Sequence, residues 1–185
     1  METKKTEMLK KAAQIVVDSG LEALTIQNLA NELKLDEKEL YELFTNEDEI
    51  LLTMFNGFEN ELKEFIYELS HNHVEAPEKE FNILFKSLYN LFLQKPYYLD
   101  IIFDKKVKKR DERIKMSILR MKDIIENYLT AIIDTGKKDN TFKTQVPTKL
   151  LVNKMLTEFR LLMKDEQYIN EMVLELKSLK KSKDE

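Results

Sequence analysis

The chain has 185 residues, 43% of them hydrophobic, and a formal net charge of −4. This length and apolar content allow a buried core, either as one domain or as two small ones. Cysteine is absent, which excludes disulfides and thiolate metal sites and is consistent with a reducing compartment. No apolar run approaches the roughly 20 residues of a membrane span, and residues 1–14 lack the apolar core of a signal peptide. We therefore expect a cytoplasmic protein with no membrane partner.

Helix-forming residues dominate, against three glycines and three prolines, so the composition predicts an all-α fold. Apolar residues recur at helical spacing over residues 5–18, and Gly20 is expected to end this first helix. Thr25 stands where an N-cap residue is expected, ahead of a short second helix that reaches about Leu33.

A third helix is predicted after a two-residue turn. Asp36 and Glu39 have capping-box spacing, and Leu40, Leu43 and Phe44 are expected to face inward. These three helices should form a compact unit. The acidic residues at 47–49 then suit the first turn of a fourth helix, which we expect to run to about residue 69.

The rest of the chain is also predicted to be helical. The periodicity favours a helix around 81–92, a short segment at 97–103 after Pro96, and a long helix at 108–135 that Gly136 ends. A loop should follow up to residue 147, and then two last helices at 148–164 and 167–180.

The N-terminal pattern matches a known family. The matching features are Ala12-Ala13, Gly20, Leu24-Thr25-Ile26, Leu29-Ala30, Leu35, Leu40-Tyr41-x-x-Phe44 and Asp48-Glu49-Ile50. As a spaced set, residues 6–54 resemble the helix-turn-helix domain of the TetR family of transcriptional regulators. The resemblance implies a three-helix DNA-binding domain at 1–46 and an effector-binding and dimerisation domain at 47–185, about nine helices in all. It also implies a homodimer on double-stranded DNA, with reading helices in successive major grooves, and no cofactor.

Candidate DNA contacts follow from the resemblance and from the charges available. They are Lys4 and Lys5 as an N-terminal arm, Thr25 and Tyr41 as hydroxyl donors, Lys34 in the turn, and Glu37, Lys38, Glu39 and Glu42 on the reading helix.

The charge of this region argues against strong DNA binding. Residues 1–56 carry six lysines and twelve acidic residues, whereas phosphate neutralisation normally requires a basic surface. Glu47 also stands where the family usually places a lysine that reaches a phosphate. A carboxylate can read the amine of cytosine, but several acidic residues on one helix repel phosphate. We therefore keep two hypotheses: a TetR-like regulator that acts as a repressor in the family's manner, and a degenerate relative that no longer binds DNA and acts through a protein partner.

Two further sets of candidates lie outside this region. A small, largely apolar effector could contact Phe81, Phe85, Tyr89, Phe92, Tyr98, Phe103, Met116, Met121 and Tyr128, although ordinary core packing also explains such spacing. By analogy with the family, the dimer face would hold Leu151, Met155, Phe159, Leu162, Ile169, Met172, Val173 and Leu176.

The remaining polar features favour ordinary surface roles. His71 and His73 are predicted to lie in a solvated connection, since the chain has no other histidine to complete a metal site. The basic run 105–110 could bind nucleic acid or anionic lipid, but such runs are usually solvated. No pattern of a nucleophile, a general base or a phosphate-binding loop is present, so we predict neither catalytic residues nor an enzyme.

Overall fold

The structure is a computed structural model that describes residues 2–71 and 76–178, with side chains from residue 4. Within these ranges there are eleven α-helices, one short 3-10 helix and no strand, which confirms the all-α prediction. Two compact units are present. The first comprises residues 1–61 and 96–119, and the second 62–95 and 120–185. The functional boundary expected near residue 46 stays a prediction.

The first unit begins with the trihelical segment. It contains α1 (Glu2–Ser19), the 3-10 helix η1 (Leu21–Ala23), α2 (Ile26–Leu33) and α3 (Glu37–Tyr41). Gly20, with φ of 82°, separates α1 from η1, a conformation that glycine adopts without steric cost. Apolar residues of all three helices form one core, in which the fully or nearly fully buried side chains are Met8, Ala12, Ile15, Val16, Ile26, Leu29, Leu40 and Phe44.

The first unit also includes the start of α4 (Glu47–His71), α6 (Tyr97–Phe103), α7 (Val107–Arg110) and the start of α8 (Glu112–Lys138). Tyr98 attaches α6 to α4, because its hydroxyl donates a 3.0 Å hydrogen bond to the Met54 carbonyl. Its ring also stacks on Phe58, with centroids 4.0 Å apart.

The helix predicted over 108–135 is in fact two helices. Asp111 is extended, with φ of −147° and ψ of 133°, and lies between α7 and α8. Its carboxylate accepts a 2.7 Å hydrogen bond from the Arg113 N–H, so it caps a new helix. The periodicity carries no sign of this break, because the apolar spacing continues across it.

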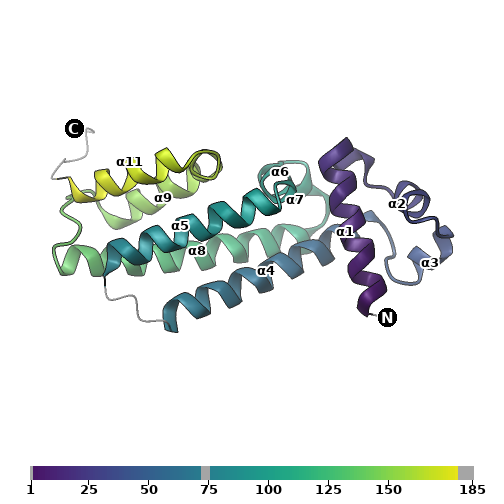
Figure 1. Ribbon diagram of the computed structural model, residues 1–185, viewed down its shortest axis with the longest axis horizontal. Coiled ribbons are helices and arrows are strands. Elements are labelled where there is room, and N and C mark those ends of the chain that lie inside the picture. The colour runs from purple at the N-terminus through teal and green to yellow at the C-terminus, as the bar shows by residue number, and fades with distance from the viewer. Residues whose placement is uncertain (1, 72–75, 179–185) are drawn as a thin grey trace. The chain divides into compact units, whose positions relative to one another are not determined.

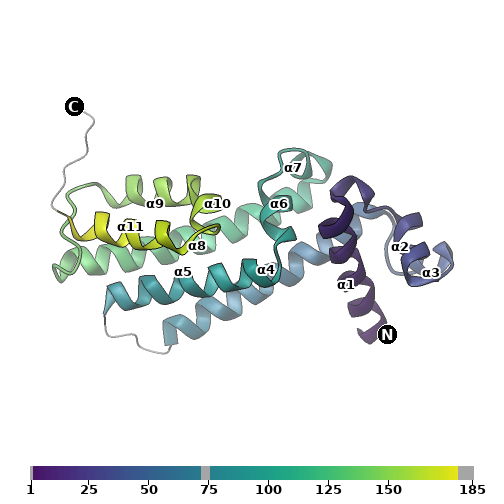
Figure 2. The same cartoon turned by 45° about the horizontal axis from the view of Figure 1, so that its top comes forward.

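The second unit contains α5 (Pro77–Gln94), the rest of α4 and α8, α9 (Thr148–Thr157), α10 (Phe159–Leu162) and α11 (Glu166–Lys177). Helices α9 and α11 run side by side in two views (Figures 1 and 2). The ring of Phe81 packs on Phe85 within α5, and Phe92 meets Phe159 edge-on at 5.8 Å.

The helix predicted over 148–164 is also broken. Glu158, with φ of −89° and ψ of 2°, lies between α9 and α10. The break accompanies the packing of Phe159 against α5. The last helix, expected to reach residue 180, ends at Lys177, and residues 179 and 180 lie outside the described ranges.

The sequence predicted that Gly136 ends this helix. In the structure α8 continues past it to Lys138. The role of the glycine is to admit a side chain. A Cβ at this position would lie 2.2 Å from Cδ2 of Phe142, whose ring covers the glycine. Phe142 also donates its N–H to the Gly136 carbonyl at 2.8 Å, after a reversal at Asn140 with φ of 65°. Glycine is therefore required by the close approach of an aromatic ring.

Candidate nucleic-acid interface and effector core

The α2–turn–α3 segment has the geometry predicted from its capping residues. Thr25 caps α2, accepting a 3.1 Å hydrogen bond from the Asn28 N–H. The turn passes through Lys34 in the left-handed conformation, with φ of 55°, and Leu35 donates its N–H to the Ala30 carbonyl. Lys34 itself is exposed.

The outward face of α3 presents both charges and a phenol. Glu37, Lys38 and Glu42 are exposed, and the Tyr41 side chain is 52% exposed although it is aromatic. A large aromatic side chain that stays exposed on a packed helix is available to contact a binding partner. Four of the nine candidate DNA-contact residues therefore lie on one accessible surface.

Two acidic residues, the N-cap Asp36 and Glu39 of α3, bind groups within the chain. The carboxylate of Asp36 accepts a 2.9 Å hydrogen bond from the Lys38 N–H, and the Asp36 N–H in turn donates to Glu39. Glu39 also pairs with Lys4 at 2.6 Å. The hydrogen bond from Lys4, followed by that from the Asp36 N–H, lowers the pKa of Glu39 below its ordinary value of 4.5. The same contact raises the pKa of Lys4.

The expected N-terminal arm is not an extended segment. Lys4 and Lys5 belong to α1, where Lys4 binds Glu39 and the Lys5 ammonium lies 5.6 Å from the centre of the Phe44 ring. Both lysines thus contact residues of the same trihelical segment. This corrects the interpretation of an arm, because α1 already begins at Glu2, ahead of both lysines.

Glu47 has a contact that the sequence did not indicate. Its Oε1 accepts a 3.1 Å hydrogen bond from the backbone N–H of Ile26, the first residue of α2. Free N–H groups at a helix N-terminus are natural anion sites. Here a carboxylate from the chain itself satisfies one of them.

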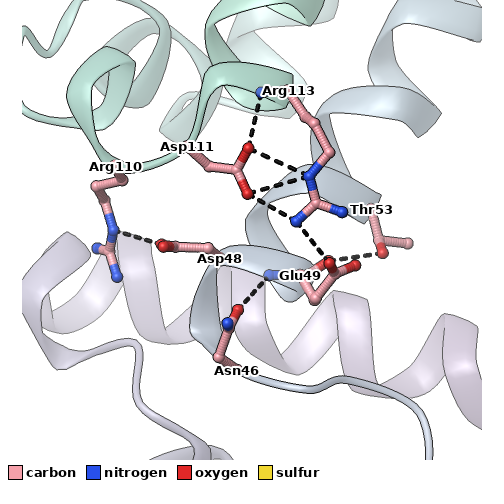
Figure 3. Close-up of polar contacts among 7 residues, drawn as sticks. All are labelled: Asn46, Asp48, Glu49, Thr53, Arg110, Asp111 and Arg113. Carbon is pink, nitrogen blue, oxygen red and sulfur yellow. Dashed lines mark hydrogen bonds and ion pairs between the residues drawn. The ribbon is translucent and has the colours of Figure 1, made fainter.

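A set of ion pairs joins the start of α4 to α7 and α8 within the first unit (Figure 3). Arg110 Nε lies 2.6 Å from Asp48, and Arg113 bridges Glu49 at 2.7 Å and Asp111 at 2.6 Å. The hydrogen bond between Asp111 and Arg113 is the largest cause of two pKa shifts: the pKa of Asp111 is lowered and that of Arg113 is raised.

Sequence reasoning missed this cluster. It assigned the acidic residues of 47–49 to the helix dipole and the basic run to solvent. The two segments are 62 residues apart at Asp48 and Arg110, and charge patterning alone does not pair residues at that separation.

The candidate effector residues divide between the two units. Six belong to the second: Phe81, Phe85, Tyr89, Phe92, Met121 and Tyr128. The three phenylalanines and Met121 are buried, so this part of the set forms an apolar core. Tyr128 adds one polar group, because its hydroxyl donates a 2.5 Å hydrogen bond to Glu80, and burial raises its pKa.

The other three candidates belong to the first unit. Tyr98 is buried between α6 and α4, Phe103 is partly buried, and Met116 is 42% exposed. Met116 therefore faces solvent rather than a core, which corrects the expectation for that residue. Its place in the helical pattern was close to an apolar stripe but not on it.

All eight predicted dimer-face residues are buried inside the chain's own second unit. At most 9% of any of them is exposed: Leu151, Met155, Phe159, Leu162, Ile169, Met172, Val173 and Leu176. They therefore present little surface to a partner. The same helices instead expose Leu150, Leu161, Tyr168 and Leu174, between 37% and 67%.

Two of the predictions from the sequence concern histidine ligands and membrane spans. No group of three or more histidine, aspartate or glutamate residues lies close enough there to hold a metal ion. His71 ends α4, exposed and packed on Tyr67, while His73 lies outside the described residues. None of the described helices is both long enough and apolar enough to cross a membrane.

No protein-family model and no curated protein matches the sequence. Solved structures do match. The TetR-family regulator PfmR of Thermus thermophilus is 20% identical with a TM-score of 0.78, covering 94% of this chain and 98% of its own. The ketosteroid regulator KstR2 of Mycobacterium tuberculosis is 15% identical with a TM-score of 0.78, covering 94% of each chain.

A third structure, the regulator FadR of Bacillus subtilis in complex with stearoyl-CoA, is 14% identical with a TM-score of 0.67, covering 94% of this chain and 97% of its own. Structural matches at identities this low establish a shared fold. They do not transfer the ligand of one protein to another. The helix-turn-helix resemblance and the helical remainder are both confirmed at that level. The chain has the fold of the TetR-family transcriptional regulators.

Proposed function

We propose that the protein is a TetR-like transcriptional regulator that binds DNA as a homodimer and is released by a small, largely apolar effector. The observation that carries this proposal is the α2–turn–α3 surface, where Lys38, Tyr41 and Glu42 are exposed together beside Lys34. A basic side chain and a phenol can hold phosphates, while a glutamate can accept a hydrogen bond from cytosine.

Internal pairing reduces the repulsion that the sequence suggests. Asp36 and Glu39 are engaged in the capping box, and Lys4 compensates Glu39 directly. This leaves Glu37 without a basic partner in the described part of the chain, whereas Glu42 lies within electrostatic reach of Lys4. Because exposed charges are screened by salt, the remaining repulsion should weaken non-specific binding more than contacts made directly to bases.

The effector would occupy the second unit. Its aromatic and aliphatic core, with the Tyr128–Glu80 pair as a polar point, suits a ligand that is mostly hydrocarbon. The FadR structure solved with stearoyl-CoA supports an effector of that class. Ligand binding would shift a preexisting equilibrium between two arrangements of the DNA-binding surfaces of the dimer.

The alternative is a protein of the same fold that has lost DNA binding and contacts a basic protein partner. Glu47 favours it, because its carboxylate occupies the α2 N-terminus where a phosphate could bind. The acidic surface would then steer a positively charged partner to the trihelical segment.

Fluorescence anisotropy separates the two proposals. The protein would be titrated into labelled duplex DNA from its own upstream region and into a scrambled duplex, across a salt series. A regulator should prefer the native duplex, and Lys38→Ala and Tyr41→Ala should each weaken that binding about tenfold. Lys79→Ala, an exposed lysine on α5, serves as the control that should change nothing. Equal or absent binding to both duplexes would favour the alternative.

A further inference from the structure

A pocket of about 560 Å³ opens on the surface of the first unit where α7 meets α8. Four lysines and one glutamate line it, together with two aliphatic side chains: Lys105, Lys108, Lys109, Glu112, Lys115, Ile118 and Leu119. This is an unusual concentration of positive charge in a chain whose net charge is negative. The proposed DNA surface and the apolar core of the second unit do not include any of these residues.

The neighbouring basic residues are compensated, and those of the pocket are mostly not. Lys106 pairs with Glu22, and Arg110 with Asp48, so both contact acidic residues outside the pocket. Within the described part of the chain, by contrast, Lys105, Lys108 and Lys109 have no ion pair or side-chain hydrogen bond. Three lysines that line one pocket without a counter-charge repel one another, and an anion bound among them would reduce that repulsion.

The single acidic residue of the pocket does not cancel this charge. Glu112 accepts hydrogen bonds of 2.9 and 3.1 Å from Lys115, one turn later on α8. These two residues therefore compensate each other. The three lysines before α8 remain as the positive part of the pocket.

Two aliphatic side chains also line the pocket. Ile118 is 5% exposed and belongs to the core, whereas Leu119 is 40% exposed beside it. A leucine at this exposure offers hydrocarbon surface that a ligand can cover. A ligand that fills the pocket thus needs a strongly negative group and a hydrocarbon part within one small molecule.

We propose that this pocket is a binding site for a phosphorylated amphiphile. Its phosphate would lie among Lys105, Lys108 and Lys109, and its aliphatic part against Ile118 and Leu119. Lysine ammonium groups act as point charges that hold phosphate without the planar pairing that arginine imposes on a carboxylate. The site is separate from the proposed effector core and does not require that the protein bind DNA.

Isothermal titration calorimetry tests the proposal with octyl phosphate, kept below its micelle concentration. The neutral detergent octyl glucoside and inorganic pyrophosphate are the comparison ligands. Wild-type protein should bind octyl phosphate measurably more tightly than pyrophosphate, and should not bind octyl glucoside. Affinity for octyl phosphate should fall as salt rises, because phosphate–lysine contacts at a surface are screened.

Two variants locate the site. Lys108→Gln combined with Lys109→Gln should weaken octyl phosphate binding at least about tenfold, since two of three uncompensated charges are removed. The matched control is Lys79→Gln with Lys149→Gln, which removes the same charge from exposed lysines of the second unit and should leave affinity unchanged. Leu119→Ala should weaken octyl phosphate about fivefold but leave pyrophosphate binding as it was.

A second arm distinguishes a free ligand from a lipid headgroup. Flotation with vesicles containing phosphatidic acid, compared with purely zwitterionic vesicles, reports lipid surfaces. Octyl phosphate binding without vesicle binding assigns a free phosphorylated amphiphile, whereas binding of both assigns the same chemistry to a lipid. Absence of octyl phosphate binding, equal loss in both double variants, or binding to duplex DNA through these lysines with no binding of octyl phosphate would overturn the proposal.

Discussion

Oε1 of Glu47 lies 3.1 Å from the backbone nitrogen of Ile26 and accepts its hydrogen bond. The first residue of α4 thus satisfies the N–H group of the first residue of α2. Helix N-termini attract anions because their N–H groups are free and their dipole is positive there. A side-chain carboxylate at this point adds to helix stability and competes with an incoming phosphate. Glu47 therefore stabilises the fold of the trihelical segment, and the same carboxylate disfavours phosphate binding there.

We expect Glu47→Lys to raise affinity for duplex DNA about tenfold at low salt, because it removes the competing carboxylate and supplies a positive charge. The same change should lower the free energy of unfolding by about 1 kcal/mol, since the Ile26 N–H loses its acceptor. Anisotropy and urea denaturation measure the two effects. Glu47→Gln is the control, which keeps an acceptor and should preserve more of the stability. Unchanged DNA affinity in Glu47→Lys would show that this position does not approach phosphate.

The Lys4–Glu39 pair predicts a pH dependence of stability. The folded-state pKa of Glu39 lies below its unfolded value, so the pair contributes fully above about pH 4.5. Its contribution is lost as the pH falls through the lower, folded-state pKa. The difference in melting temperature between wild type and Glu39→Gln should therefore be constant near neutral pH and shrink at strongly acidic pH. Glu37→Gln, which removes an acid without an ion pair, should show no such convergence.

A double-mutant cycle measures the contact between Asp48 and Arg110. Their side chains are only 25% and 29% exposed, so we expect a coupling of about 0.5–1 kcal/mol from Asp48→Asn, Arg110→Gln and the double variant. The surface pair Lys122–Glu126 is the comparison, at about 0.3–0.5 kcal/mol for a pair one helical turn apart. Chemical denaturation gives both values. Zero coupling at Asp48 and Arg110 would mean that the contact in Figure 3 does not hold α7 to α4 in solution.

Two glycines inside helices should respond to the same change in opposite directions. Gly136→Ala would place a methyl group 2.2 Å from the Phe142 ring and should destabilise the protein by about 2 kcal/mol. Gly57 has no atom within 4 Å of the equivalent position, so Gly57→Ala should stabilise α4 by about 0.5–1 kcal/mol. Thermal unfolding of both variants checks the pair. A tolerated Gly136→Ala would mean that Phe142 does not cover the glycine.

The proposed dimer should depend on the exposed apolar residues of α9–α11 rather than the buried ones. Leu174, 67% exposed, is the best candidate, and Leu174→Asp should shift the protein from dimer to monomer without unfolding it. Leu93→Asp changes a residue that is 60% exposed on α5 and should leave the dimer intact. Sedimentation velocity and circular dichroism report assembly and folding. A wild-type chain that is monomeric at micromolar concentration would contradict the homodimer itself.

Local signals predicted much of the fold. The Thr25 cap, the Asp36 capping box and the segment 97–103 all appear in the structure where the residues indicated. Each depends on interactions between near neighbours in the chain, which spacing and side-chain chemistry express directly. Local signals did not predict the helix breaks at Asp111 and Glu158, because the apolar periodicity continues through both.

What the sequence by itself determined is therefore the all-α class, the order of the helices and the trihelical pattern that resembles the TetR family. Tertiary structure alone decided which charges meet, since Glu47 reaches Ile26 and Arg110 reaches Asp48 across distant parts of the chain. It also decided what the apolar stripes of the last helices cover. Periodicity shows that a helix face is buried, but the same pattern serves a partner or the chain's own core. Only the packed structure shows that Met172, Val173 and Leu176 face inward.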